Sequence, residues 1–92
     1  MRPRILAITG PLKGCAFQIT SSELILGRDE ANSICLEDDL ASRQHTSLRL
    51  EDDRVVVRDL DSTNGTFVNN SSVSIKVLEH GDRLKIGSSV FI

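Results

Sequence analysis

The sequence predicts an all-β domain, an antiparallel β-sandwich of about ten or eleven short strands in two sheets. No stretch of its 92 residues shows a sustained helical period of apolar side chains. Short β-rich runs recur instead, separated by turn residues such as Gly, Pro and Asn. A chain of 92 residues also has room for only one hydrophobic core, so we expect a single domain over residues 1–92.

The first half of the chain contains four expected strands. Residues 4–9 form an apolar run that ends at Gly10-Pro11, a strong break in regular structure. Residues 15–19 alternate apolar and polar side chains, as a strand with one buried face does. Residues 23–27 are mostly apolar, which indicates burial on both sides, and residues 33–36 form a short strand after a polar loop.

The clearest strand pair covers residues 46–51 and 54–59. Both segments alternate with period two, and Asp52-Asp53 makes a tight connection between them. Four more short strands are expected at residues 66–68, 73–75, 82–86 and 89–92. Strands at such short and regular spacing are typical of a sandwich.

Composition and charge argue against several classes of protein. The chain has 13 acidic and 11 basic side chains, whereas a nucleic-acid-binding domain usually has a basic excess. It has no Trp or Tyr and only three Phe, so few rings could stack on bases. Its apolar runs are far too short to span a bilayer, and no signal peptide is recognisable. We expect a cytoplasmic domain that contacts neither nucleic acid nor membrane.

The reactive side chains form no catalytic or metal-binding pattern. Ser42 and His45 lie three residues apart, without a nucleophile elbow or a third triad member. The two histidines and two cysteines lack the paired spacing of a metal site. Cys15 and Cys35 are expected to be reduced residues of the core. We expect no enzyme activity, no metal and no cofactor.

Three polar blocks stand at the ends of expected strands. Gly27-Arg28 ends one apolar strand, Ser42-Arg43-Gln44-His45 precedes another, and residues 61–65 form a loop crowded with short polar side chains. Together the blocks supply guanidinium, hydroxyl and amide donors on loops held by a rigid scaffold. A phosphothreonine offers about −1.5 to −2 charges and three strong acceptor oxygens. The donors therefore suit a phosphate.

In this order the blocks resemble the forkhead-associated (FHA) domain, a phosphothreonine-binding β-sandwich with the FHA/SMAD-like fold. Gly27-Arg28 matches the family's Gly-Arg, and residues 42–45 match its Ser-Arg-any-His. Residues 62–69 match its Asn-Gly-Thr block, and residues 78–87 match its closing hairpin. One departure is Asn70, where the family often has Gly; Asn also tolerates a positive φ. The resemblance covers nearly the whole chain.

The resemblance implies roles for individual residues. Contacts with the phosphopeptide are implied for Arg28, Ser42, Arg43, Thr63 and Asn64, of which Asn64 would hold the peptide backbone and the others the phosphate. Structural support of the site is implied for Gly27, His45, Gly65 and Asn69. His45 would brace the loop that carries Ser42, and Asn69 would either order the binding loop from behind or reach the peptide.

The expected function is recognition of a phosphothreonine-containing protein or peptide, such as a substrate of a Ser/Thr kinase. The first residues resemble the start of bacterial regulatory proteins that open with this domain, some of them transcription activators, so an N-terminal piece of a longer protein is expected. The alternative is a phosphate-independent assembly domain with a vestigial pocket. Five acids, in Asp29-Glu30 and Glu37-Asp38-Asp39, further predict a neutral or basic segment next to the phosphothreonine, since they would repel an acidic one.

Overall fold

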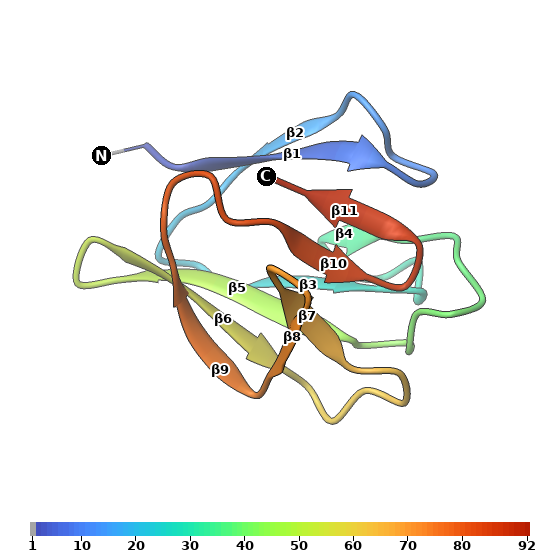
Figure 1. The fold of residues 1–92 in the computed structure, drawn as a ribbon. Coiled ribbons are helices and arrows are strands. Elements are labelled where there is room, and N and C mark those ends of the chain that lie inside the picture. The colour runs from blue at the N-terminus through green and yellow to red at the C-terminus, as the bar shows by residue number, and fades with distance from the viewer. Residues whose placement is uncertain (1) are drawn as a thin grey trace.

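The computed structural model describes residues 2–92, and these form two facing β-sheets without a helix (Figure 1). One sheet contains β1 (Arg4–Thr9), β2 (Ala16–Gln18), β7 (Thr66–Val68), β8 (Ser71–Val73), β10 (Leu84–Ile86) and β11 (Ser89–Phe91). The other contains β3 (Leu24–Gly27), β4 (Ile34–Cys35), β5 (Thr46–Glu51), β6 (Arg54–Asp59) and β9 (Ile75–Leu78).

The strand order is β2-β1-β11-β10-β7-β8 in the six-stranded sheet and β4-β3-β5-β6-β9 in the five-stranded sheet. Neighbouring strands are antiparallel, except that β3 and β4 are parallel. The expected all-β sandwich of two sheets is confirmed. Residues 2–92 also contain no helix of the length and apolarity that a membrane crossing requires.

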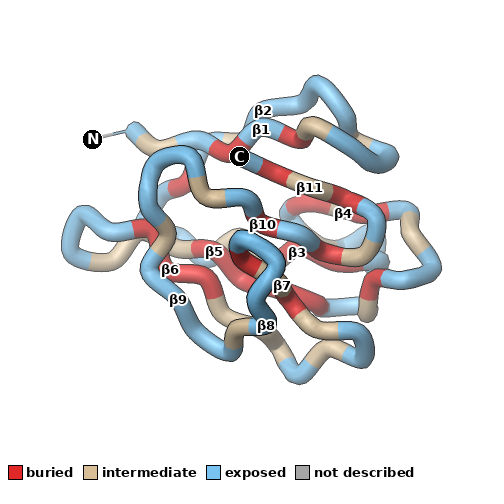
Figure 2. Tube along the Cα trace, viewed as in Figure 1, coloured by how far each residue is buried: buried red, intermediate tan, exposed pale blue. Residues whose placement is uncertain are grey.

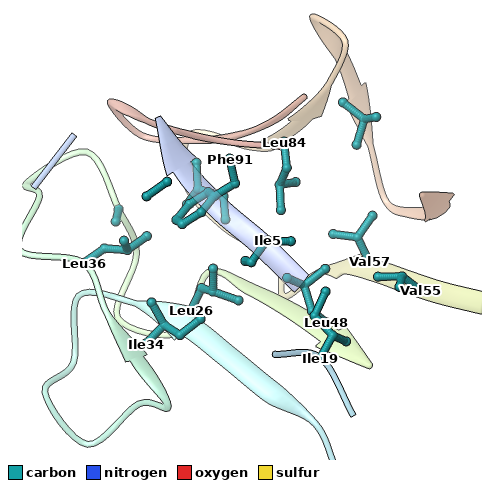
Figure 3. Close-up of a cluster of buried hydrophobic side chains, with 14 residues drawn as sticks. Ile5, Ile19, Leu26, Ile34, Leu36, Leu48, Val55, Val57, Leu84 and Phe91 are labelled. Atoms are coloured by element: carbon teal, nitrogen blue, oxygen red, sulfur yellow. The ribbon is translucent and has the colours of Figure 1, made fainter. Parts of the chain in front are cut away.

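The core lies between the sheets. Figure 3 shows Ile5, Leu84 and Phe91 from one sheet across from side chains of the other, Leu26, Leu48 and Val57. In the six-stranded sheet, burial alternates along the strands (Figure 2), as in β10, where Leu84 and Ile86 are buried and Lys85 is exposed. In the five-stranded sheet, β5 and β6 each contain three successive buried residues. Full burial of a Leu or Phe side chain contributes roughly 1.5–3 kcal/mol, so this layer supplies most of the stability.

The chain reverses at a tight turn between β5 and β6 and changes sheet between β8 and β9. Asp52 and Asp53 have φ of 50° and 61°, the left-handed values of a type I′ turn, so the β5–β6 hairpin is as tight as expected. The single strand expected at residues 73–75 is wrong, because the chain forms β8 before Ser74 and β9 after it. β8 pairs with β7 and β9 pairs with β6, so the chain crosses between the sheets at Ser74.

The expectation of two core cysteines is also wrong. Cys15 is exposed in the connection between β1 and β2, and Cys35 is half-buried on the edge strand β4. Both are free thiols. A strand at a sheet edge leaves one side chain in two toward solvent, so Cys35 need not reach the core, and Cys15 lies outside the strands.

Candidate functional site

The three polar blocks lie at one end of the sandwich, in the connections β3–β4, β4–β5 and β6–β7 (Figure 1). The β4–β5 connection is central, because residues of the other two hydrogen-bond to its backbone and to Ser42. Arg28 and Asn64 donate to its carbonyl groups, and the Thr63 amide donates to the Ser42 hydroxyl. The structure therefore brings together four of the five residues implied to contact a phosphopeptide.

Arg28 is tied to the β4–β5 connection twice. Its amide donates to the Ser42 carbonyl oxygen at 2.9 Å, and its Nε donates to the Ala41 carbonyl oxygen at 3.1 Å. Nε is the only nitrogen of this guanidinium that donates within residues 2–92. The exposed side chain is thereby oriented, and its two terminal amino groups can make the planar paired contacts that suit a phosphate.

Ser42, Thr63 and Asn64 belong to the β4–β5 and β6–β7 connections, which hydrogen bonds hold together. The Ser42 Oγ accepts the Thr63 amide hydrogen at 2.9 Å, which leaves the hydroxyl proton able to donate outward. The Asn64 Nδ2 donates to the Leu40 carbonyl oxygen at 2.9 Å. That bond orients the amide, and its Oδ1 can accept a hydrogen bond from a peptide N–H.

Gly27 allows β3 to lie directly against the β4–β5 connection. A Cβ at this buried position would stand 2.2 Å from the Arg43 carbonyl oxygen and 2.8 Å from that of Ser42. No side chain fits at such distances, so the glycine is required by close approach of two backbones. Arg28, the next residue, depends on that approach for both of its hydrogen bonds.

His45 connects two of the loops from inside the protein. Its side chain is fully buried, and its Nδ1 accepts the Ser42 amide hydrogen at 3.0 Å while its Nε2 donates to the Gly65 carbonyl oxygen at 2.8 Å. One acceptor and one donor nitrogen define a neutral ring with the proton on Nε2. Gly65 has φ of +89°, a value that suits glycine in this turn.

Asp59 organises the β6–β7 loop, and sequence reasoning missed it. Its carboxylate accepts hydrogen bonds from the Ser62 amide and hydroxyl and from the Thr66 hydroxyl, and the Ser62 Oγ in turn accepts the Gly65 amide hydrogen. Burial raises the pKa of Asp59, but these hydrogen bonds lower it more, so the pKa lies below its ordinary value. An Asp three residues before a Ser at a turn is the signal that could have found this motif.

Asp38 holds the β4–β5 connection from the other side. Its carboxylate accepts the Ser88 amide and hydroxyl hydrogens, both at 2.7 Å, and the Leu40 amide hydrogen at 2.9 Å. The Ser88 amide and hydroxyl hold the pKa of Asp38 below its ordinary value. Of the three acids at residues 37–39, Asp38 is therefore structural, while Glu37 and Asp39 are exposed.

The two remaining implied site residues lie in different places, Asn69 away from the binding loops and Arg43 on the β4–β5 connection. Asn69 lies after β7, at the far end of that strand from Asn64, where its amide donates to Asp82 and its oxygen accepts the Arg83 amide hydrogen. It thus braces the turn before β10 and not the binding loops. The carbonyl oxygen of Arg43 accepts hydrogen bonds from Asn32 and the Asp29 amide, while the Arg43 side chain is exposed beside the site.

Known proteins are similar to this chain in sequence. The model of the FHA domain family matches residues 24–87. The glycogen accumulation regulator GarA of Mycobacterium tuberculosis is 38% identical over 78 residues, which are 85% of this chain and 48% of GarA. The chain thus spans about half the length of the curated relatives it matches.

Known structures share its fold. A structure described as an analysis of phosphothreonine-dependent FHA domain interactions is 32% identical with a TM-score of 0.91, covering 100% of this chain and 94% of that one. The structure of Mycobacterium tuberculosis EmbR in complex with a low affinity phosphopeptide is 26% identical with a TM-score of 0.86, covering 96% of this chain and 23% of EmbR. With the family model spanning most of its length and its fold shared with these structures, this chain belongs to the forkhead-associated (FHA) domain family.

Proposed function

We propose that this domain recognises a phosphorylated threonine in a partner protein and thereby connects a Ser/Thr kinase to a regulatory response in a bacterium. The observation that carries the proposal is the convergence of Arg28, Ser42, Thr63 and Asn64 on one connection, through hydrogen bonds of 2.9–3.1 Å. The solved EmbR complex, which contains a phosphopeptide, supports it. The domain would act as a cytoplasmic binding module without catalysis.

Each residue has a role that its geometry allows. The terminal amino groups of Arg28 would hold two phosphate oxygens, and the Ser42 hydroxyl would donate to a third. Thr63 would contribute a hydroxyl on the far side, and Arg43 a second positive charge. The oriented amide of Asn64 would hold the peptide backbone beside the phosphothreonine, while Gly27, His45 and Gly65 support the loops from behind.

The test compares two degenerate peptide libraries that differ only in phosphothreonine or threonine at the central position. We expect the phosphorylated library to bind more tightly by fluorescence anisotropy. Arg28→Ala should cost about 2–3 kcal/mol of binding free energy, because it removes charge-assisted hydrogen bonds, while circular dichroism stays unchanged. The control is Arg54→Ala at the β5–β6 turn, which removes an exposed arginine away from the site and should bind as the parent does.

Salt and pH give a second measurement of the same interaction. Affinity for the phosphorylated library should fall with added salt, which screens the charges. It should also fall below about pH 6, the second pKa of the phosphate, because a monoanion attracts Arg28 less than a dianion.

The competing function is phosphate-independent assembly through a sheet face. Equal binding of the two libraries, together with no effect of Arg28→Ala, would support assembly and contradict phosphothreonine recognition. Sedimentation of the unliganded domain then measures self-association directly.

A further inference from the structure

The outer face of the six-stranded sheet carries basic side chains and no acidic ones. Its six strands contain Arg4 and Lys85 but no Asp or Glu, and Arg83 directly precedes β10. All three basic side chains are exposed. The protein as a whole has a net charge of −2, so this segregation of charge is local.

The strand register places these cations among apolar side chains. Leu84 and Ile86 point into the core, so Lys85 between them points outward, opposite Val90 on one neighbouring strand and Phe67 on the other. Val90 and Phe67 are half-buried and lie outside the core cluster. Leu6, also directed outward, is 39% exposed.

A shallow hollow of about 420 Å³ opens on this face, and Arg83, Lys85 and Val90 line it together with Asn69 and Asn70. Within residues 2–92 neither Arg83 nor Lys85 has a carboxylate at ion-pair distance. Asp82, the acid next in sequence, is already bound by the Asn69 amide and the Glu79 backbone. The side chains of Arg83 and Lys85 can therefore pair with an anionic group of another molecule.

The outer face of the other sheet is different. There Glu51 forms ion pairs with Arg49 and Arg58, so part of the positive charge is paired within the sheet, although its strands carry four basic and two acidic side chains. Exposed charges that pair with one another gain little from a partner, whereas unpaired like charges attract an oppositely charged surface.

The cationic face begins at the edge of the candidate phosphothreonine site. β10 runs into the turn at Gly87 and Ser88, which is tied to Asp38 of the β4–β5 connection. Lys85 lies two residues before Gly87, about 7 Å of strand. The ring of Phe67 also approaches to 3.4 Å of the Cβ position at Gly65, in the β6–β7 loop.

We propose that this face, defined by Arg4, Leu6, Phe67, Arg83, Lys85 and Val90, is a second docking surface, occupied by an acidic segment with apolar side chains in the partner bound at the loops. The proposal rests on the proposed function for the identity of that partner. Position along the peptide then decides the effect of an acidic residue. The exposed acids Asp29, Glu30, Glu37 and Asp39 disfavour it next to the phosphothreonine, and the cationic face favours it farther along.

Four peptides test the proposal. Each has phosphothreonine or threonine at the centre of a degenerate core, followed by a short Gly-Ser linker and a tail of alternating Glu and Leu or Phe. In half of them Gln replaces every Glu in the tail. Binding is measured for the parent, for the double variant Arg83→Gln/Lys85→Gln, and for the control Arg54→Gln/Lys76→Gln, which removes the same charge elsewhere.

The Glu tail should tighten binding to the parent by roughly three- to tenfold over the Gln tail, as two exposed ion pairs and some apolar contact allow. That gain should vanish in Arg83→Gln/Lys85→Gln and persist in the control. Amide resonances of Phe67, Lys85 and Val90 should shift when the Glu tail is present and not with the Gln tail.

Equal affinity for the two tails would overturn the docking surface, as would an equal loss of the gain in the control variant. Equal affinity for the phosphothreonine and threonine cores with the tail effect retained would contradict the proposed function alone. Sedimentation with anionic phospholipid vesicles that needs Arg83 and Lys85, without any tail preference, would assign the face to a membrane and overturn a protein partner.

Discussion

The core of the sandwich and the loop end that carries the candidate site are stabilised by different interactions. In the core, apolar side chains from two sheets pack against one another in one cluster. At the loop end, individual polar side chains such as His45 and Asp59 each fix a particular backbone group. Substitutions in the core should therefore change stability, and substitutions at the loop end should change binding geometry.

The clearest difference between the core and the loop end is expected for a core substitution far from the loops, which should lower stability and leave peptide affinity unchanged. Leu84→Ala removes a buried side chain of β10 and should lower the free energy of unfolding by about 2–5 kcal/mol, through lost burial and a residual cavity. Urea unfolding measures the loss, and Ile86→Val, at about 1 kcal/mol, is the graded control. Peptide affinity of the folded fraction should match the parent; a matching loss of affinity would show that the regions are coupled.

Gly27→Ala is expected to affect both regions, because Gly27 lies where they meet. The new Cβ would stand 2.2 Å from the Arg43 carbonyl oxygen, so the β4–β5 connection must move away. We expect about 1–3 kcal/mol of lost stability, as for other overpacked sites, and a loss of peptide affinity. Gly14→Ala provides a contrast with open space around its Cβ, although its φ of +92° also strains an alanine. Unchanged affinity in Gly27→Ala would mean that the loops bind without this close approach.

Ser42→Ala should change binding with little effect on folding. The variant loses a hydroxyl that can donate to phosphate and that accepts the exposed Thr63 amide, which water can satisfy instead. We expect about 1 kcal/mol less binding free energy by calorimetry. Ser72→Ala, an exposed serine on β8, is the control. A large drop in melting temperature for Ser42→Ala would place this serine among the structural residues.

Acid should destabilise the loop end through Asp59. Its pKa is lower in the folded state than in the unfolded chain, so the stability it contributes is present above about pH 4 and is lost as pH falls through the folded value. Unfolding free energies measured down to acid pH should fall more steeply for the parent than for Asp59→Asn. Parallel curves would show that Asp59 makes no such contribution.

The smallest effect is expected on the outer face of the five-stranded sheet. Glu51→Gln breaks ion pairs with Arg49 and Arg58, whose side chains are 41% and 33% exposed. Pairs this accessible to water and salt contribute little, so neither the unfolding midpoint nor peptide affinity should change measurably. A clear loss of stability would identify an ion-pair network stronger than its exposure implies.

Much of the fold and part of the candidate site could be predicted from the sequence. Period-two alternation and turn residues are local signals, so both sheets and the β5–β6 turn could be predicted. Arg28, Ser42 and Asn64 could be grouped because their blocks stand at strand ends. The hydrogen bonds that hold these loops together could not be predicted from the sequence. Leu40 and Ala41 accept them through backbone carbonyl groups, which every residue has.

Other features depend on tertiary context. Residues 71–78 have a strand-like composition throughout, and only the pairing of β8 and β9 with different neighbours reveals the break at Ser74. Asn69 stands in the same sequence block as Asn64, but the three residues of β7 carry it to the other end of the strand. Proximity in sequence was misleading there, because an extended strand moves about 3.3 Å per residue.

The buried ring of His45 affects how the two recognition loops can change by substitution. One side chain that no ligand would touch joins the Ser42 amide to the Gly65 carbonyl oxygen, so two recognition loops keep their relative placement from within. Exposed residues such as Asp39 and Leu40 can therefore be exchanged without rebuilding the frame beneath them. New preferences for flanking residues could arise one surface substitution at a time.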